Sequence, residues 1–430
     1  AYADNSGVTI FKGEKITPGV YAVVTKGPKY FEIIVNEQKM SIETSTDNFI
    51  ERMNVLESDE NKAFYEYINF LNSKKQESFP LAKEFQDSTI SEKEKSAIKL
   101  KLDALDLEVK EFQELFDEKY YPRLFAAELM GMNYDVVMPD DIKPEDKYYY
   151  YKSHFFDRLD FNNDRFAHSP AFMNKVDKYF EEVLVRNPDS IYLAAFELAD
   201  GIKNKKSDTW KLLVHFVMNK FEHSKIMGMD KVFVRLGQKY YCTTDSLAHW
   251  MPKESLIKVC EKVDVIEHLI IGEKTPNIIL QDTTESNWVN LHKDINSKWT
   301  VLVFWDPDCG HCKEEIPQIN EMYLRHKDSI DMSIVAVCGV LETGEWKAFV
   351  KENALDWIHI SDNPEINGNP YKYLHKTTIE SLNFRQTYDI FSYPQVYLLD
   401  ENKIIRAKKL GAESLENVLL ELEGRNLSPE

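Results

Sequence analysis

Residues 301–312, VLVFWDPDCGHC, decide the fold of this chain. Their first half is an uninterrupted apolar run, which is typical of a buried β-strand. Residues 313–319, KEEIPQI, follow with helical character. Cys309 and Cys312 therefore stand at a predicted strand-to-helix junction, and two residues between two cysteines is the spacing of a redox-active dithiol.

The first turn of the predicted helix gives these cysteines their chemistry. Unpaired backbone N–H groups and the helix dipole stabilise an anion there, so the Cys309 thiol is expected to ionise readily. Cys312 lies one helical turn further on, close enough to close a disulfide with Cys309. A protonated His311 favours the thiolate, whereas Asp306 and Asp308 oppose it. We expect the helix terminus and His311 to prevail.

Length and charge limit the classes of function. A chain of 430 residues is long enough for two or three domains. Its 53 Lys and Arg residues against 72 Asp and Glu residues give a net charge of −19, which repels nucleic acid and anionic lipid. The sequence has no run of 18 apolar residues, so no transmembrane segment is predicted. It begins with Ala1 rather than Met, which suggests a mature chain whose export signal, if any, has been removed.

The cysteines do not by themselves reveal the redox compartment. Besides the closely spaced pair, the chain contains Cys242, Cys260 and Cys338, an odd number without a dense disulfide framework. We expect Cys242 and Cys260 to be inert thiols.

Residues 1–57 are predicted to form a β-rich N-terminal domain. Short β-rich runs alternate there with turn residues, a pattern that indicates an antiparallel meander. The predicted strands are residues 8–11, 19–24, 30–35, 40–44 and 49–53, with turns at 18–19 and 26–29.

Residues 58–271 are predicted to form a mostly α-helical middle domain. Ser58 or Asp59 can cap its first helix. Residues 98–116 carry apolar side chains at heptad spacing, which pack either within an antiparallel bundle or across a homodimer, and we favour the bundle. Further helices are predicted around residues 172–185, 189–203, 209–222, 229–241 and 254–270.

Residues 272–430 alternate between strands and helices. This order predicts a single α/β sheet covered by helices on both faces. The predicted strands lie near residues 278–280, 288–291, 300–305, 332–337, 357–360, 395–399 and 403–408. The predicted helices follow Cys309, lie near residues 345–352 and 379–388, and begin at Ser414.

This third region resembles the thioredoxin superfamily, and within it the extracytoplasmic TlpA/ResA-like thiol-disulfide oxidoreductases. The resemblance rests on Phe304–Trp305 before CGHC, on Pro317 at the position of a helix-kinking proline, and on Tyr393–Pro394 ahead of a strand. It implies a thioredoxin fold over roughly residues 272–425. The layout of the whole chain also resembles multidomain, exported thioredoxin-like proteins of Gram-negative bacteria.

The resemblance assigns chemical roles around the dithiol. It implies that Cys309 is the attacking thiolate, that Cys312 is the resolving thiol, and that Glu315 relays a proton near Cys312. Thioredoxin keeps a buried aspartate on the strand before the pair, but Val303 occupies that position here. Proton transfer is therefore expected to fall to Glu315 or to water.

The resemblance also implies how a substrate is held. Pro394 is the expected cis-proline beside the sulfurs, and the backbone at Tyr393 is expected to pair with an extended substrate. Trp305, Gly310 and His311 are expected to complete the active-site loop.

Together these features predict a thiol-disulfide oxidoreductase. It would act as a reductase or isomerase on protein thiols and disulfides, with a redox partner protein and with no metal or other cofactor. The resemblance implies a periplasmic or other envelope-exported location.

Three alternatives remain open. Half of a zinc site would need two further soft ligands, and the sequence has no second C-x-x-C. A thiol peroxidase would need a threonine just before the reactive cysteine, where Pro307–Asp308 stand instead. The long first two regions are also consistent with a partner-binding assembly protein that uses the thioredoxin-like region as a scaffold.

Overall fold

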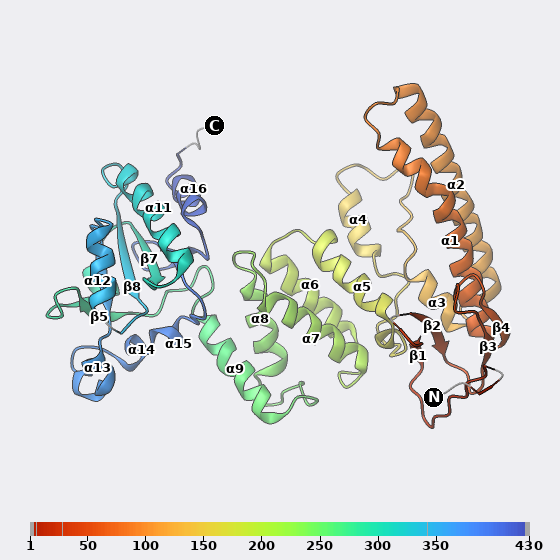
Figure 1. Ribbon diagram of the computed structural model, residues 1–430, viewed down its shortest axis with the longest axis horizontal. Coiled ribbons are helices and arrows are strands. Elements are labelled where there is room, and N and C mark those ends of the chain that lie inside the picture. The colour runs from red at the N-terminus through yellow and green to blue at the C-terminus, as the bar shows by residue number, and fades with distance from the viewer. Residues whose placement is uncertain (1–3, 6, 28, 342, 426–430) are drawn as a thin grey trace. The chain divides into compact units, whose positions relative to one another are not determined.

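The computed structural model describes residues 4–5, 7–27, 29–341 and 343–425 (Figure 1). Internal contacts divide the chain into two compact units. The first comprises Ala1–Arg186 with Glu197–Leu213, and the second comprises Asn187–Phe196 with Val214–Glu430. The three-region division predicted from the sequence stays a prediction. Within the described residues, no helix is both long and apolar enough to cross a membrane.

Four short strands form two separate two-stranded antiparallel sheets in the first unit. Two of the predicted strands are wrong. Residues 8–11 have no strand partner in the described part of the chain and expose their large side chains, and residues 49–53 form a turn before the last strand. Pro28, in a predicted turn, lies outside the described residues. The pairs are β1 (Gly19–Val24) with β2 (Tyr30–Val35) and β3 (Ser41–Glu43) with β4 (Asn54–Glu57).

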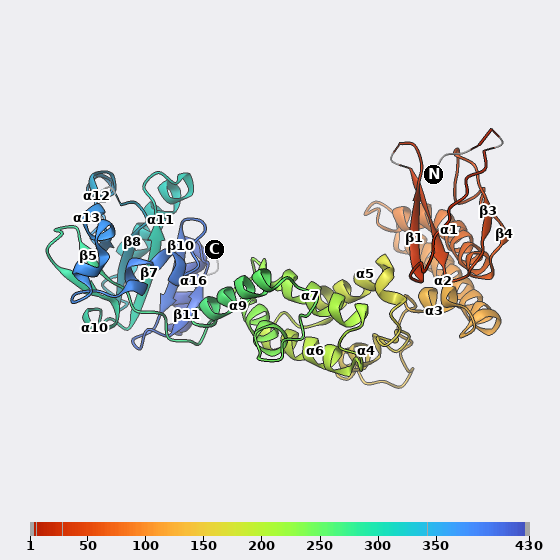
Figure 2. The same ribbon diagram turned by 90° about the horizontal axis from the view of Figure 1, so that it is seen from below.

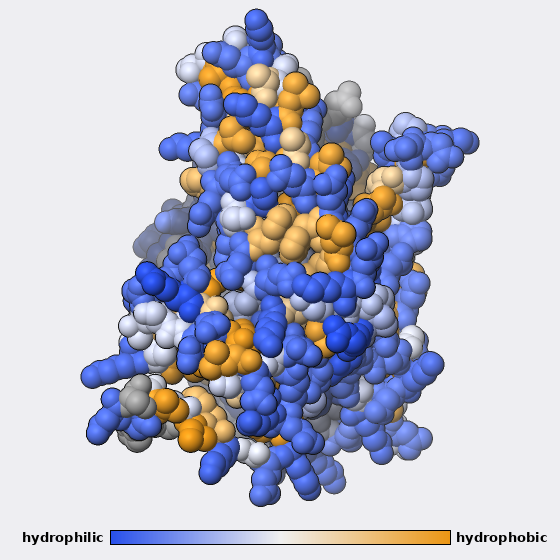
Figure 3. All heavy atoms as spheres, turned by 90° about the vertical axis from the view of Figure 1, so that its right-hand side faces the viewer, coloured by the Kyte–Doolittle hydropathy of each residue, from blue (hydrophilic) through white to orange (hydrophobic). Residues whose placement is uncertain are grey.

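Two long helices, α1 (Asp59–Phe85) and α2 (Glu92–Tyr120), lie side by side in the first unit. Ser58 caps α1 as expected, because its side chain accepts a hydrogen bond from Asn61 N at 3.0 Å. The predicted heptad seam packs on α1, where Phe112 stacks on Phe70 with ring centroids 3.8 Å apart. Leu100, an apolar residue off the seam, is exposed. Figure 3 shows hydrophobic side chains scattered among hydrophilic ones on the face that it draws. The homodimer stays a prediction.

The helical middle region is confirmed. Its helices are α3 (Phe125–Gly131), α4 (Lys147–His154), α5 (Pro170–Lys178), α6 (Pro188–Gly201), α7 (Asp208–Glu222), α8 (Asp230–Leu236) and α9 (Lys253–Glu267). Short π-helical turns follow α5 and α8, at η2 (Tyr179–Val183) and η3 (Gly237–Tyr241).

Cys242 and Cys260 form a disulfide, so the expectation of inert thiols is wrong. Cys242 follows η3 and Cys260 lies in α9, and their Cα atoms are 5.5 Å apart. The two cysteines are 18 residues apart in the sequence and belong to different elements. The sequence alone therefore carries no signal that they meet.

A seven-stranded mixed sheet forms the C-terminal region, which confirms the predicted α/β fold (Figures 1 and 2). Its strand order is β11-β10-β7-β8-β9-β5-β6. The strands are β5 (Ile279–Asp282), β6 (Trp288–Asn290), β7 (Trp299–Trp305), β8 (Met332–Cys338), β9 (Ile358–Ser361), β10 (Gln395–Leu399) and β11 (Ile405–Lys408). The helices are α10 (Leu291–Asp294), α11 (Gly310–His326), α12 (Thr343–Glu352), α13 (Pro364–Gly368), α14 (Ile379–Leu382), α15 (Phe384–Thr387) and α16 (Ala412–Leu422).

Strand β7 lies at the centre of this sheet, and all of its residues are buried. Alternate side chains enter two different cores, as the period of a strand requires. Val301 and Val303 pack with residues of α11, α12 and α16, whereas Leu302 and Phe304 pack with residues of α10, α14 and α15 on the other face. The sheet is therefore covered on both faces.

A buried ion pair joins the helical part of the second unit to the sheet. The Lys408 ammonium at the end of β11 donates to Asp230 Oδ2 at the start of α8, and also to the backbone carbonyl of Leu269. Only 3% of the Lys408 side chain is exposed. Because burial removes both charges from water, each charge is stabilised mainly by the other.

We predict that Lys408→Met destabilises the protein by about 3–5 kcal/mol, because it leaves the Asp230 carboxylate buried without a counter-charge. Urea unfolding followed by tryptophan fluorescence measures the change. The double variant with Asp230→Leu is the matched control, and it should recover most of the loss. A single variant as stable as the wild type would contradict the pairing.

Candidate active site

The two closely spaced cysteines lie where β7 gives way to α11. After Trp305 the chain makes a tight turn, in which Asp306 Oδ1 accepts from Asp308 N at 2.8 Å and Asp306 O accepts from Cys309 N at 3.2 Å. Cys309 is the N-cap residue of α11, and its own side chain makes no capping hydrogen bond to this helix. The first N–H groups of α11 therefore remain available to stabilise a thiolate.

The two thiols differ in exposure. Cys309 is half-buried, whereas Cys312 is fully buried, and both are free thiols. Burial raises the pKa of Cys312 to about 12, and a hydrogen bond with the Cys309 thiol contributes to the same shift. The Cys309 sulfur can thus contact a large substrate, while the buried Cys312 sulfur stays protonated.

The segment before β10 lies against the dithiol. Strand β10 runs antiparallel to β7 with Gln395 opposite Phe304, so the residues just before Gln395 reach the turn that follows β7. The Tyr393–Pro394 peptide bond is cis. The Cys309 thiol donates a hydrogen bond to Tyr393 O at 3.3 Å. The structure therefore brings Tyr393 and Pro394 together with the cysteine pair.

Gly310 and His311 form the first turn of α11, and both are at least partly exposed. Trp305, expected in the active-site loop, is instead the last residue of β7 and is fully buried. Its ring packs against Phe349 at a centroid distance of 5.1 Å. An indole that ends an all-buried strand continues the core rather than the loop.

Glu315 lies one turn beyond Cys312 on α11, and its carboxylate has a structural partner. Its Oε1 accepts a hydrogen bond from Ala412 N at 2.6 Å, in the first turn of α16. The carboxylate thus caps α16 and holds it against α11. The role of Glu315 in relaying a proton to Cys312 stays a prediction.

Arg385 supports the cis-proline segment from behind, a contact that sequence reasoning missed. Its guanidinium donates to the backbone carbonyl of Gly339 and lies 3.9 Å from Asp362 Oδ2. Its charge also opposes the rise that burial causes in the pKa of the Tyr393 side chain. Gly339 is required there, since a Cβ atom would overlap the Tyr393 hydroxyl. These residues lie far apart in the sequence and follow no motif, so no local signal identifies them.

Asp362 is the buried carboxylate behind the site. Its exposure is 1%, and burial raises its pKa although the Arg385 charge opposes the shift. It follows β9, whereas the buried aspartate of thioredoxin corresponds to Val303, on β7. Cys338, opposite Trp305 in the β7–β8 register, is a buried thiol whose pKa burial raises to about 12.

Comparisons with known proteins support this description of the C-terminal region. Residues 271–408 match the AhpC/TSA family, and residues 135–268 match a domain of unknown function, DUF5106. A thiol-disulfide oxidoreductase ResA of Bacillus cereus is 27% identical over 153 residues, which is 35% of this chain and 76% of that protein. The ResA protein of Bacillus anthracis is 26% identical over the same shares.

A solved structure supports the fold over a longer stretch. The crystal structure of a thioredoxin-like protein from Bacteroides caccae matches with a TM-score of 0.50 and 15% identity, covering 67% of this chain and 98% of that one. At this identity the likeness concerns the fold alone. The C-terminal part of the chain is thus an AhpC/TSA, thioredoxin-like domain, and its curated relatives are thiol-disulfide oxidoreductases.

His359, which stacks on Trp357 beside Trp305, makes stability depend on pH. Burial lowers its pKa from 6.5 to about 4. Between these values the unfolded chain binds a proton that the folded chain does not, so the free energy of unfolding falls as pH decreases, by about 3 kcal/mol at pH 4. Urea unfolding at pH 7, 5.5 and 4.5 should show this slope, and His359→Phe should flatten it. An equal slope in both proteins would refute the assignment.

We predict that iodoacetamide labels Cys309 at least about a hundred-fold faster than Cys312 or Cys338 in the folded protein at pH 7.5. The reason is that both buried thiols stay protonated and shielded. Peptide mapping by mass spectrometry measures the three rates separately. In Cys309→Ser, label should enter only after denaturation, and labelling of Cys312 at the same rate as Cys309 would rule out this division of roles.

Proposed function

We propose that the chain is a reductase or isomerase that exchanges the Cys309–Cys312 dithiol with disulfides of protein substrates. The observation that carries the proposal is the pairing of a half-buried thiol at a helix N-terminus with a buried thiol one turn behind it. The cis Tyr393–Pro394 segment beside Cys309 supplies a backbone against which an extended substrate can lie. The names of the curated relatives support the same chemistry.

The exchange proceeds in two displacements. The Cys309 thiolate attacks one sulfur of the substrate disulfide, forming a mixed disulfide and releasing the other substrate sulfur as a thiolate. Cys312 then loses its proton and attacks Cys309 Sγ, which closes the intramolecular disulfide and releases the second substrate thiolate. Two electrons pass to the substrate, and its thiolates take up the two protons that the enzyme dithiol gives up.

The buried position of Cys312 makes its deprotonation the demanding step. A thiol with a pKa of about 12 needs a proton acceptor when it attacks, and we propose that the departing thiolate, water or Glu315 accepts the proton. A redox partner protein then returns the couple to its dithiol form. The same steps run in reverse when a client is oxidised.

We further propose that the protein works in an oxidising compartment outside the cytoplasm, such as the periplasm. The Cys242–Cys260 disulfide supports this, because structural disulfides persist in such compartments and are rare in the cytosol.

The test is reduction of insulin disulfides by the dithiothreitol-fed protein, followed by turbidity. We predict that Cys309→Ser lowers the rate at least about a thousand-fold, since it removes the nucleophile. With dithiothreitol removed, reduced Cys312→Ser should accumulate a mixed disulfide with insulin that is visible on a non-reducing gel. Cys338→Ala is the matched cysteine control that retains activity in the full assay.

Other results would favour other functions. Peroxide consumption that depends on Cys309, without insulin reduction, would make the protein a thiol peroxidase. Retention of a bound partner and of the cellular phenotype in the Cys309→Ser, Cys312→Ser double variant would favour a partner-binding protein instead.

A further inference from the structure

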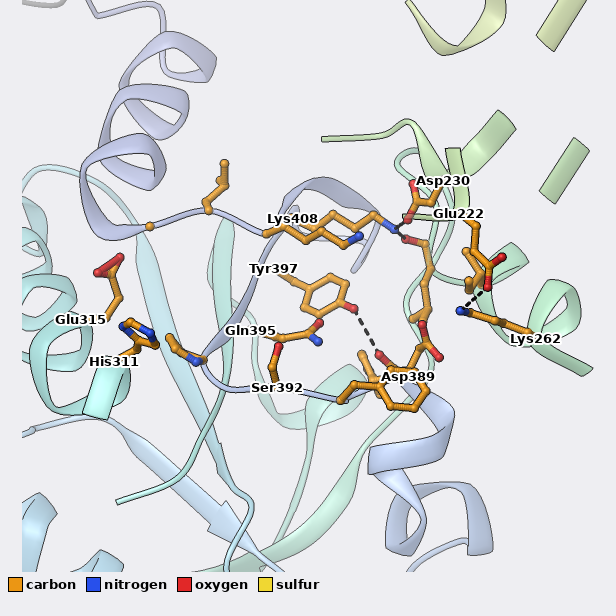
Figure 4. Close-up of a pocket in the computed structure, with 18 of the residues that line it drawn as sticks. Glu222, Asp230, Lys262, His311, Glu315, Asp389, Ser392, Gln395, Tyr397 and Lys408 are labelled. Atoms are coloured by element: carbon orange, nitrogen blue, oxygen red, sulfur yellow. Dashed lines mark hydrogen bonds and ion pairs between the residues drawn. The ribbon is translucent and has the colours of Figure 1, made fainter. Parts of the chain in front are cut away.

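A groove lies next to the first turn of α11, within the second unit (Figure 4). Its volume is about 560 Å³, and His311 and Pro394 of the candidate active site both line it. Ligand pockets in proteins span about 300–1,000 Å³, so a groove of this volume can hold side chains of a peptide. A chain whose sulfur lies at Cys309 can therefore continue into the groove without leaving the protein surface.

The helical part of the second unit forms the opposite wall of this groove. Glu222 at the end of α7 accepts a hydrogen bond from the Lys262 ammonium of α9 at 2.7 Å, and both side chains line the groove. Figure 4 shows this pair on the side away from His311 and Glu315. The Lys262 ammonium also lies 5.9 Å from the ring centroid of Phe391, a side chain that is 83% exposed just before the cis-proline segment.

The groove carries more negative than positive charge. Five carboxylates and three lysines line it, and Lys262 and Lys408 are each already paired with a carboxylate. Asp230 is 8% exposed, and while its Oδ2 binds Lys408, its Oδ1 has no hydrogen-bond partner within the described ranges. This buried oxygen is a vacant acceptor at the groove wall.

Asp389 is a second carboxylate of the groove wall whose burial is costly. It is half-buried, and burial raises its pKa although Lys262 and Lys409 oppose the shift. A cationic group entering the groove would relieve this cost, whereas an acidic group would add to it. The groove can thus distinguish basic from acidic segments, because it attracts the first and repels the second.

We propose that this groove binds the segment of a protein substrate that flanks its reactive cysteine, and that this segment carries a basic side chain. The inference rests on the proposed disulfide exchange and deepens it by naming the substrate class. It also assigns a role to the helices before the thioredoxin-like domain, because α7 and α9 supply the groove wall that selects the substrate.

Two substitutions test the proposal, and they are expected to change the preference for basic over acidic substrates in opposite directions. Asp389→Asn removes a carboxylate, and asparagine suits the positive φ of 51° at this position. Lys262→Met keeps the bulk of the side chain and leaves Glu222 without its counter-charge. Asp328→Asn and Lys258→Met are the matched controls, because both residues are exposed and lie outside the groove.

The probes are two disulfide-linked synthetic peptides of matched length, one with lysine and one with glutamate on both sides of the cysteine. The readout is the ratio of kcat/KM for the basic peptide to that for the acidic one, which cancels any general change in dithiol reactivity. Binding of the same peptides with serine in place of cysteine, measured by fluorescence anisotropy, provides a readout that needs no turnover.

The full-length wild-type protein should prefer the basic peptide in both measurements. Asp389→Asn should lower the preference about five-fold and Lys262→Met should raise it by a similar factor, as expected for a partly exposed ion pair. The controls should keep the wild-type ratio. A ratio that neither variant moves, or a preference for the acidic peptide, overturns the groove assignment. If binding discriminates but no peptide is reduced, the groove stands and the proposed exchange fails.

Discussion

The burial of one strand governs the rest of the second unit. Strand β7 has no exposed residue and supplies side chains to two cores, so the chain leaves the core only where this strand ends, at Trp305. The turn at residues 306–309 is the first place where polar atoms reach the surface, and α11 begins directly after it. The position of the candidate active site is therefore a consequence of where the core ends.

Local signals made the C-terminal fold predictable. An apolar run, a C-x-x-C pair and a proline ahead of a strand are each written in consecutive residues, and each strand predicted after residue 272 is present. In the N-terminal part, β-rich composition did not suffice, because residues 8–11 have no partner strand among the described residues to complete a sheet. The Cys242–Cys260 bond and the Arg385 contacts depend on tertiary structure, which periodicity does not report.

The carboxylates around the dithiol show which contacts the spacing of residues in the sequence can predict and which it cannot. Glu315 is close to Cys312 in the sequence, yet its oxygen is occupied by the first turn of α16. Asp362 is distant in the sequence but buried behind the same site, where Arg385 links it to the Tyr393 segment. Proximity along a helix thus predicted a location but not a hydrogen-bond partner. The groove likewise could not be predicted, because its walls come from helices and loops that meet only in the folded chain.

The Lys408–Asp230 pair has an evolutionary consequence. Its members are 178 residues apart, one in the helical part and one in the thioredoxin-like domain. Recombination could replace only one of these parts by a homologous part that lacks the charge. The remaining charge would then be buried without its counter-charge. The two parts are therefore expected to be inherited as a block, and substitutions at the two positions should occur together in descendant lineages.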